Sequence, residues 1–234
     1  MTEETNKNSS SSKLIWDIPT RIFHWALAIS ILGSWYTMEI SYDITKHKYC
    51  GYAILTLLLF RFVWGVFGTK YARFRNFIFA PRETLSYAKN FFSKNGKRYA
   101  GHNPLGAIAV FVMMLLILIQ VVTGLFSSDN DYYEFGPFYF WIPENISYEL
   151  TSLHFQNFDF LKIMIGVHIF AVFLYLILKK NNLITPMFTG NKNSLPKEQE
   201  PISHSKKGLA LVIMAICIAI VYTIAVYAPK VSFF

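Results

Sequence analysis

Two histidines, His154 and His168, lie fourteen residues apart on one long apolar stretch near the end of the chain. In a helix this separation is close to four turns, or about 21 Å of rise, with a rotational offset of about 40°. Both imidazoles would therefore face the same way, at two depths of a membrane whose hydrocarbon core is about 30 Å thick. Since imidazole nitrogen binds haem iron, one helix could supply a ligand to each of two stacked haems.

Two further histidines, His24 and His47, lie at the mouths of two other apolar stretches. His47 opens its stretch and His154 lies just inside an acidic loop, so we assign both to an outer level. Counting fourteen residues inward from His154 gives His168, and the same count from His47 gives Arg61. The same count from the outer end of the first stretch gives His24. We assign these three residues to an inner level. We therefore predict an outer haem held by His47 and His154. We predict an inner haem held by His24 and His168, with a propionate compensated by Arg61.

An ionisable side chain at membrane depth is costly unless it faces the protein interior and finds a partner. A metal porphyrin would satisfy all four of these histidines, because it takes an imidazole nitrogen on each face of the iron. The alternative is that the histidines only form hydrogen bonds between helices.

The remaining histidines have other interpretations. His204 lies in a polar, lysine-containing loop and is expected to be solvated. His102 lies at the inner mouth of the third apolar stretch, where helix capping, lipid contact or a hydrogen bond near a cofactor edge are favoured over axial ligation. Cys50 and Cys217 are single and far apart in the sequence, which favours small apolar roles over a disulfide or covalent haem attachment.

The composition is that of a membrane protein. Of the 234 residues 53% are hydrophobic and 15% are charged, whereas a soluble domain has about 25% charged residues. Five stretches are long enough to span a bilayer as helices, which predicts an all-α membrane protein. They are residues 22–40, 50–68, 104–126, 158–179 and 208–228.

The formal charge of +8 is concentrated in loops between the apolar stretches, so it does not indicate a nucleic-acid-binding face. The segment 70–98 is rich in Lys and Arg, whereas the segment 129–159 contains Asp and Glu and no Lys or Arg. The positive-inside rule then places segments 70–98 and 179–207 in the cytoplasm. Five spans put the N-terminus inside and Phe234 outside.

Local signals mark several helix boundaries. Asp17 and Pro19 suit the start of the first span, and Asn103 with Pro104 suits the start of the third. Pro81 could begin a helix on the cytoplasmic leaflet, where anionic lipids favour its cations. The segment 132–141 is unusually aromatic, which indicates either an aromatic belt at the outer interface or a docking surface for a partner.

Several motifs together resemble the bacterial cytochrome b561 and nickel-hydrogenase cytochrome b family. They are WDIPTRIFHW around His24, HKYCGY at His47, LLLFRFVWGVFG around Arg61, GHNPLG at His102, QVVTGLFSSD, and the pair His154 and His168. The resemblance extends over residues 16–192. It implies a four-helix transmembrane bundle that carries two haem b groups across the bacterial cytoplasmic membrane, with axial ligands at the four histidines of the two levels.

On this interpretation the chain divides into a polar cytoplasmic tail (1–15), a di-haem cytochrome b domain (16–192), a cytoplasmic linker (193–207) and an additional helix (208–234). The fifth span departs from the four-helix pattern of the family, so we interpret it as peripheral.

The resemblance implies electron transfer between the quinone pool and an extracytoplasmic partner, either a c-type cytochrome or an oxidoreductase subunit. Such a chain could act as a quinone-linked oxidoreductase, with Arg21, Arg61 and His102 as weak candidates for a quinone site. One alternative is a haem-bearing membrane anchor of a hydrogenase or another oxidoreductase complex. Another is a histidine-based ion or metal transporter, which is disfavoured because the spans lack acidic residues in mid-membrane.

Overall fold

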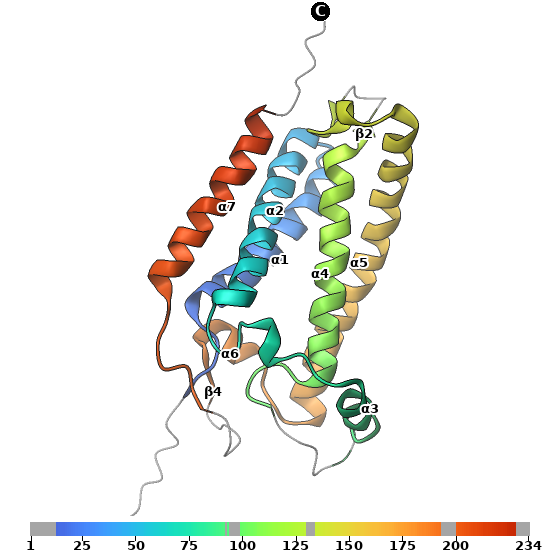
Figure 1. The fold of residues 1–234 in the computed structure, drawn as a ribbon. Coiled ribbons are helices and arrows are strands. Elements are labelled where there is room, and N and C mark those ends of the chain that lie inside the picture. The colour runs from blue at the N-terminus through green and yellow to red at the C-terminus, as the bar shows by residue number, and fades with distance from the viewer. Residues whose placement is uncertain (1–12, 92, 94–98, 130–133, 193–199, 228–234) are drawn as a thin grey trace, which may run out of the picture.

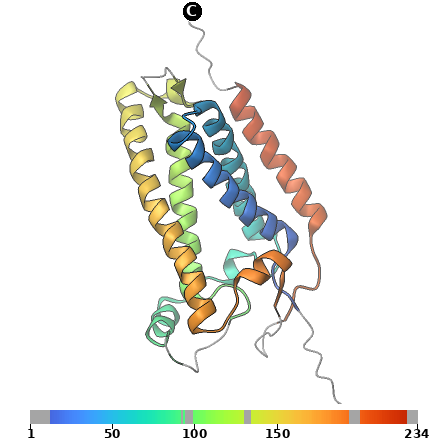
Figure 2. The same ribbon diagram turned by 180° about the vertical axis from the view of Figure 1, so that it is seen from behind.

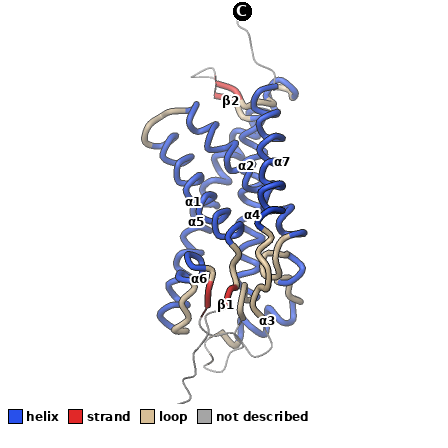
Figure 3. The backbone as a smooth tube through the Cα atoms, turned by 90° about the vertical axis from the view of Figure 1, so that its left-hand side faces the viewer, coloured by secondary structure: helices blue, strands red, loops and turns tan. Residues whose placement is uncertain are grey.

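The computed structural model describes residues 13–91, 93, 99–129, 134–192 and 200–227. Most of this chain is helical, and two pairs of very short strands lie near opposite ends of the molecule (Figure 3). The long helices are α1 (Ile18–Glu39), α2 (Ile44–Phe67), α4 (Pro104–Phe126), α5 (Glu144–Leu178) and α7 (Lys207–Tyr227). The short ones are η1 (Phe74–Asn76), α3 (Pro81–Lys89), η2 (Tyr139–Trp141) and α6 (Ile184–Thr189).

The predicted helix starts are confirmed by their capping geometry. Asp17 caps α1 by accepting a hydrogen bond from the backbone N–H of Thr20 at 2.6 Å. Asn103 caps α4 in the same way, and α3 begins at Pro81 as expected. These side chains accept hydrogen bonds that the first turn of a helix cannot form within itself.

The long helices form a bundle in two pairs, because α1 packs on α2 and α4 packs on α5 (Figure 1). Contacts between α2 and α4 join the pairs, and α7 packs along the other side of α2. Figure 2 shows α5 and α1 from behind. Two apolar clusters fill the contacts around α2. One contains Phe23, Leu57, Phe60, Trp64, Ala210, Ile213 and Cys217; the other contains Ile54, Leu58, Met114, Ile117, Val121 and Leu161.

Within the described ranges, α2, α4, α5 and α7 are long and apolar enough to cross a membrane. The prediction of membrane spans is confirmed for these four helices. Helix α1 has a suitable length of 22 residues, but polar side chains such as Ser30, Ser34 and Thr37 lower its hydropathy. Its place as a fifth span stays a prediction.

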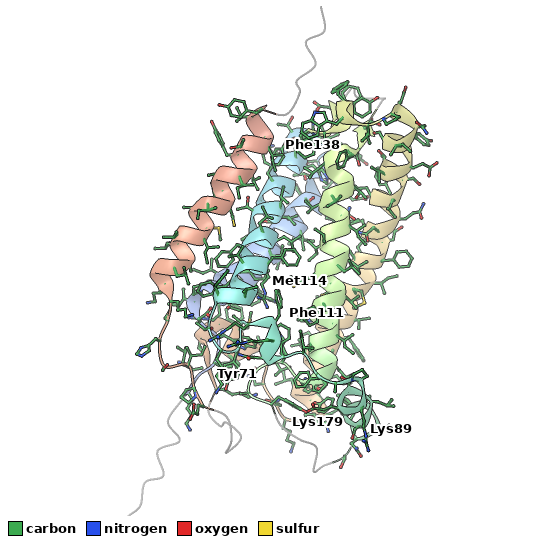
Figure 4. The ribbon with its side chains drawn as sticks, in the orientation of Figure 1. Tyr71, Lys89, Phe111, Met114, Phe138 and Lys179 are labelled. Atoms are coloured by element: carbon green, nitrogen blue, oxygen red, sulfur yellow. The ribbon has the colours of Figure 1, made fainter. Side chains whose placement is uncertain are left out.

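The two ends of the bundle differ in charge. We call the end that carries η1, α3 and α6 the basic end, since Lys70, Arg73, Arg75, Arg82 and Lys89 lie there. The opposite end, with β2, β3 and η2, is the acidic end and carries Asp43, Asp129, Glu134, Glu144 and Glu149. Figure 4 labels Lys89 and Lys179 at the basic end and Phe138 at the acidic end.

The short strands were not predicted from the sequence. At the basic end β1 (Lys13–Leu14) pairs with β4 (Asn191–Lys192), and the carbonyl of Gly190 accepts hydrogen bonds from the N–H groups of Ile15 and Trp16. Gly190 has a φ of 86°, a conformation that glycine adopts without steric cost. At the acidic end β2 (Ser128–Asp129) pairs with β3 (Glu134–Phe135). Part of the predicted aromatic segment, Tyr132 and Tyr133, lies outside the described residues.

Candidate functional site

The structure brings the four predicted ligand histidines together in two pairs. His47 on α2 faces His154 on α5, with ring centroids 6.1 Å apart and ring planes at 80°. His24 on α1 faces His168 on α5, with centroids 6.4 Å apart and planes at 51°. Helix α5 therefore supplies one ring to each pair.

The separation within each pair fits an axially ligated metal ion. Two imidazole nitrogens bound to one ion at about 2 Å, each about 1 Å from its ring centroid, place the centroids roughly 6 Å apart. Aromatic rings in direct contact also have centroids about 4.5–7 Å apart, so the chemistry of the donor sets decides the kind of site. The donor sets are imidazole only, which suits haem iron. The residues of both pairs therefore fit a bis-histidine haem.

In the pair at the acidic end, hydrogen bonds orient both rings. Nδ1 of His47 lies 3.1 Å from the carbonyl oxygen of Ser34 on α1 and 3.1 Å from the hydroxyl of the same residue. Nδ1 of His154 lies 2.9 Å from the carbonyl oxygen of Gln120 on α4. An N–H on Nδ1 directed at a carbonyl leaves Nε2 unprotonated, which is the state that binds iron.

Helix α4 approaches the His154 ring very closely. A Cβ atom on Gly124 would lie 2.9 Å from Cε1 of His154, so glycine is required for this approach. The hydroxyl of Thr123 lies 3.1 Å from Nδ1 of the same ring. Asn157, one turn along α5, is 4% exposed and donates hydrogen bonds to Leu116 O and to the side chain of Gln120. A buried polar network therefore holds the ring in place.

The pair near the basic end lacks such partners. Within the described part of the chain, neither His24 nor His168 has a hydrogen bond to its ring, and Nδ1 of His24 is buried. Packing positions these rings instead. Trp25 stacks on Phe188 of α6 with centroids 4.5 Å apart, and its indole N–H donates to Met187 O. Helix α6 therefore closes the basic end beside His24.

Arg61 is buried, with 4% of its surface exposed. Its guanidinium donates to Ala72 O at 3.0 Å and lies over the ring of Phe74, 4.6 Å from the centroid. Backbone and aromatic contacts thus hold this positive charge toward the basic end of the bundle, on the side of the pair formed by His24 and His168.

His102 is not part of either pair. Its ring lies between Trp16 and Phe77, with centroids 4.9 Å and 4.7 Å away. Burial lowers the pKa of His102 to about 3, with further contributions from the nearby Arg61, His168 and His24. The imidazole is therefore neutral at physiological pH. His204 is exposed, as expected, and both cysteines are free.

The residues that orient the rings were not predicted from the sequence. Ser34, Gln120, Thr123 and Asn157 are polar residues within apolar helices, and such residues usually face the protein interior and have a partner. Their polarity within apolar helices could therefore have identified them. The carbonyl group that each ring contacts could not be predicted, because every residue has a backbone carbonyl whatever its side chain.

A helical bundle with two facing histidine pairs, in which His47, His154 and His168 lie on helices long and apolar enough to cross a membrane, fits a membrane-bound haem protein. The model of one family, described as prokaryotic cytochrome b561, matches residues 15–190. The chain belongs to this family, and it is therefore a multi-pass b-type cytochrome whose cofactor is haem b. The predicted resemblance is confirmed.

Curated proteins similar to this chain include the probable Ni/Fe-hydrogenase 1 B-type cytochrome subunit of Escherichia coli (strain K12). It is 23% identical over 217 residues, which cover 78% of this chain and 91% of that protein. The probable Ni/Fe-hydrogenase B-type cytochrome subunit of Rhizobium leguminosarum bv. viciae is 25% identical over 215 residues, which cover 77% of this chain and 89% of that protein. No solved structure matches the chain.

Proposed function

We propose that this protein transfers electrons across the bacterial cytoplasmic membrane through two haem b groups, between the quinone pool and an extracytoplasmic partner. The observation that carries this proposal is the pair of facing imidazoles at each of two levels, with centroids 6.1 Å and 6.4 Å apart. The two levels are joined by one continuous helix, α5. A rise of about 21 Å between His154 and His168 along the helix axis would put one site toward each membrane surface.

Each haem, when bound, supplies reversible one-electron redox chemistry. His47 and His154 would hold the outer haem, and His24 and His168 the inner haem. Four imidazoles leave no open position on either iron, so the sites favour electron transfer over chemistry on a bound substrate. Arg61 would supply the positive charge that compensates a propionate of the inner haem.

The orientation follows from the charge distribution. The basic end would face the cytoplasm, because positively charged loops are retained there. The N-terminus would then be inside, and the acidic end would face outward. The di-haem domain would comprise residues 16–192, with α7 as a peripheral helix, since no residue of α7 is a candidate ligand.

The partner is proposed from the relatives, which are named as cytochrome subunits of Ni/Fe-hydrogenases. By analogy, this chain would anchor and accept electrons from a hydrogenase or a similar oxidoreductase at the acidic end. Exposed aromatic side chains there, Phe140, Trp141 and Tyr148, together with Glu144 and Glu149, offer a mixed apolar and acidic surface. A basic c-type cytochrome is the second candidate, since its charge would complement this surface.

A quinone would react near the inner haem. Arg21, Arg61 and His102 remain the candidates, because all three lie toward the basic end beside His24 and His168. Arg21 donates a hydrogen bond to Phe188 O, so it contacts α6, the helix that closes the basic end beside His24.

The test is an oxidised and a reduced absorption spectrum of the purified full-length protein, together with a count of haem per chain. Two low-spin haem b groups per chain are expected. A protein without haem would overturn the proposal, and a single haem would overturn the two-level arrangement. Purification from the native membrane with its partner attached would distinguish a hydrogenase from a soluble cytochrome.

A further inference from the structure

His102 is not an axial ligand of either proposed haem. It lies just before α4, and its ring contacts Phe77, whose centroid lies 5.9 Å from the guanidinium carbon of Arg61. Its Nδ1 is buried and has no hydrogen-bond partner among the described residues. The rings of Trp16 and Phe77 flank the imidazole, and Nδ1 is the ring nitrogen left without a partner in the described ranges.

Unpaired buried nitrogens concentrate near this place. In the described part of the chain they are Arg21 Nε, His24 Nδ1, Arg73 Nε and His102 Nδ1. All four residues belong to the basic end or to the inner histidine pair. A buried donor without an acceptor costs about 1–3 kcal/mol, so an acceptor-rich, negatively charged group is expected to complete this region.

A polar pocket of about 170 Å³ adjoins His102, and its lining includes Tyr71, Asn76, Glu83 and Tyr99. The phenol of Tyr99 donates to Glu83 within this lining at 3.0 Å. The carboxylate edge of a haem is stable in a polar environment and costly in hydrocarbon. The polar surroundings therefore favour a carboxylate edge that points toward the basic end.

We infer that His102 binds the inner haem by donating a hydrogen bond from Nδ1 to one of its carboxylates. The inference rests on the proposed function, and it adds a residue to the inner haem site besides the two axial ligands. Arg61 is directed at Ala72 O and Phe74, so its role is a nearby positive charge, whereas His102 supplies the direct contact. A neutral imidazole has one N–H to donate, and Nδ1 would carry it.

The test uses the full-length, haem-loaded protein in a lipid nanodisc and measures haem content and the reduction potential of each haem. The inner haem is identified as the one lost in a His24→Ala variant. His102→Phe removes the donor and keeps an aromatic ring between Trp16 and Phe77. His102→Gln keeps an N–H donor, and His204→Ala, at an exposed histidine, serves as a matched control.

We expect His102→Phe to lower the potential of the inner haem and leave the outer haem unchanged. Without the hydrogen bond, more negative charge stays on the carboxylate, and this favours the ferric iron. The expected change in the ratio of oxidised to reduced inner haem is about tenfold, or roughly 59 mV for one electron. His102→Gln should retain most of the original potential, and His204→Ala should retain all of it.

Three results would overturn the inference. The inner potential could be unchanged in His102→Phe, both haems could shift equally, or His102→Gln could fall as far as His102→Phe. If His102→Phe does not retain the inner haem, retention in His102→Gln would support the inference and loss in both would overturn it. Absence of haem from the unaltered protein would instead contradict the proposed function itself.

Discussion

His47 and His154 face each other from α2 and α5 with ring centroids 6.1 Å apart, and each ring directs Nδ1 at a backbone carbonyl of a further helix. Ser34 on α1 and Gln120 on α4 provide those carbonyls. All four helices of the bundle thus contribute to one pair of rings. The pair of His24 and His168 has no such hydrogen bonds among the described residues. The rings of the two levels are therefore held in position by different kinds of contact.

Single substitutions should remove different haems. His154→Ala should abolish the haem at the acidic end and His168→Ala the haem at the basic end, because each residue belongs to a different ring pair. Each variant should retain about one haem per chain, measured by pyridine haemochrome absorption against protein concentration. Loss of the same spectral component in both variants would contradict the two-level pairing.

The two haems should differ in reduction potential. Hydrogen bonds from Nδ1 make the ligands at the acidic end more basic, which stabilises ferric iron and lowers the potential. At the other level, Arg61 and the surrounding cations favour the reduced state. An optical redox titration should therefore resolve a lower potential for the haem lost in His154→Ala. A higher potential for that haem would show that other factors dominate, and it would also reverse the downhill direction from the acidic to the basic end.

Gly124→Ala should disturb the outer haem alone. The new Cβ would lie 2.9 Å from Cε1 of His154, so the ring or α4 must move. We expect reduced occupancy or an altered spectrum of the haem at the acidic end. Gly106→Ala on the same helix is the matched control, because its Cβ would meet Asn103 at an ordinary 3.5 Å. Equal effects of the two substitutions would argue against a specific contact with His154.

Asp17→Ala should destabilise the basic end. Asp17 is 1% exposed and accepts hydrogen bonds from Thr20 N and from the hydroxyl of Thr69. Loss of a helix cap and a buried charge-assisted hydrogen bond should lower the unfolding free energy by about 2 kcal/mol. Denaturant unfolding in detergent, followed by helical circular dichroism, would measure this.

Asp43→Ala is the control for that prediction. Asp43 also caps a helix, α2, by accepting a hydrogen bond from Lys46 N at 2.9 Å. Hydrogen bonds with Lys46 lower the pKa of its carboxyl group, but its side chain is 30% exposed. Its loss should therefore cost less than the loss of Asp17. A larger loss of unfolding free energy in Asp43→Ala than in Asp17→Ala would show that burial does not determine how much a cap stabilises the protein.

Electron exchange with a basic soluble cytochrome should depend on salt. The acidic end carries carboxylates around exposed aromatic side chains, and opposite charges accelerate encounter at low ionic strength. Stopped-flow oxidation of the reduced protein should slow as salt rises, and Glu144→Gln with Glu149→Gln should weaken that dependence. A rate independent of salt would exclude this surface as an electrostatic docking site.

The sequence by itself determined the features that depend on local pattern. Helix length, apolar composition and capping at Asp17 and Asn103 act within a few turns, so they can be read from neighbouring residues. The axial distance between His154 and His168 follows from their fourteen-residue separation and the geometry of one helix. The charge difference between segments 70–98 and 129–159 is likewise a property of the chain itself.

Only the tertiary structure decided which groups meet across helices. Helix packing and rotation place His24 opposite His168, bring the carbonyls of Ser34 and Gln120 to their rings, and turn Arg61 toward Ala72 O. The pairing of β1 with β4 and the cover that α6 forms beside Trp25 join segments more than 150 residues apart. Such contacts depend on the relative rotation and axial position of packed helices, and no local pattern in the sequence specifies these quantities.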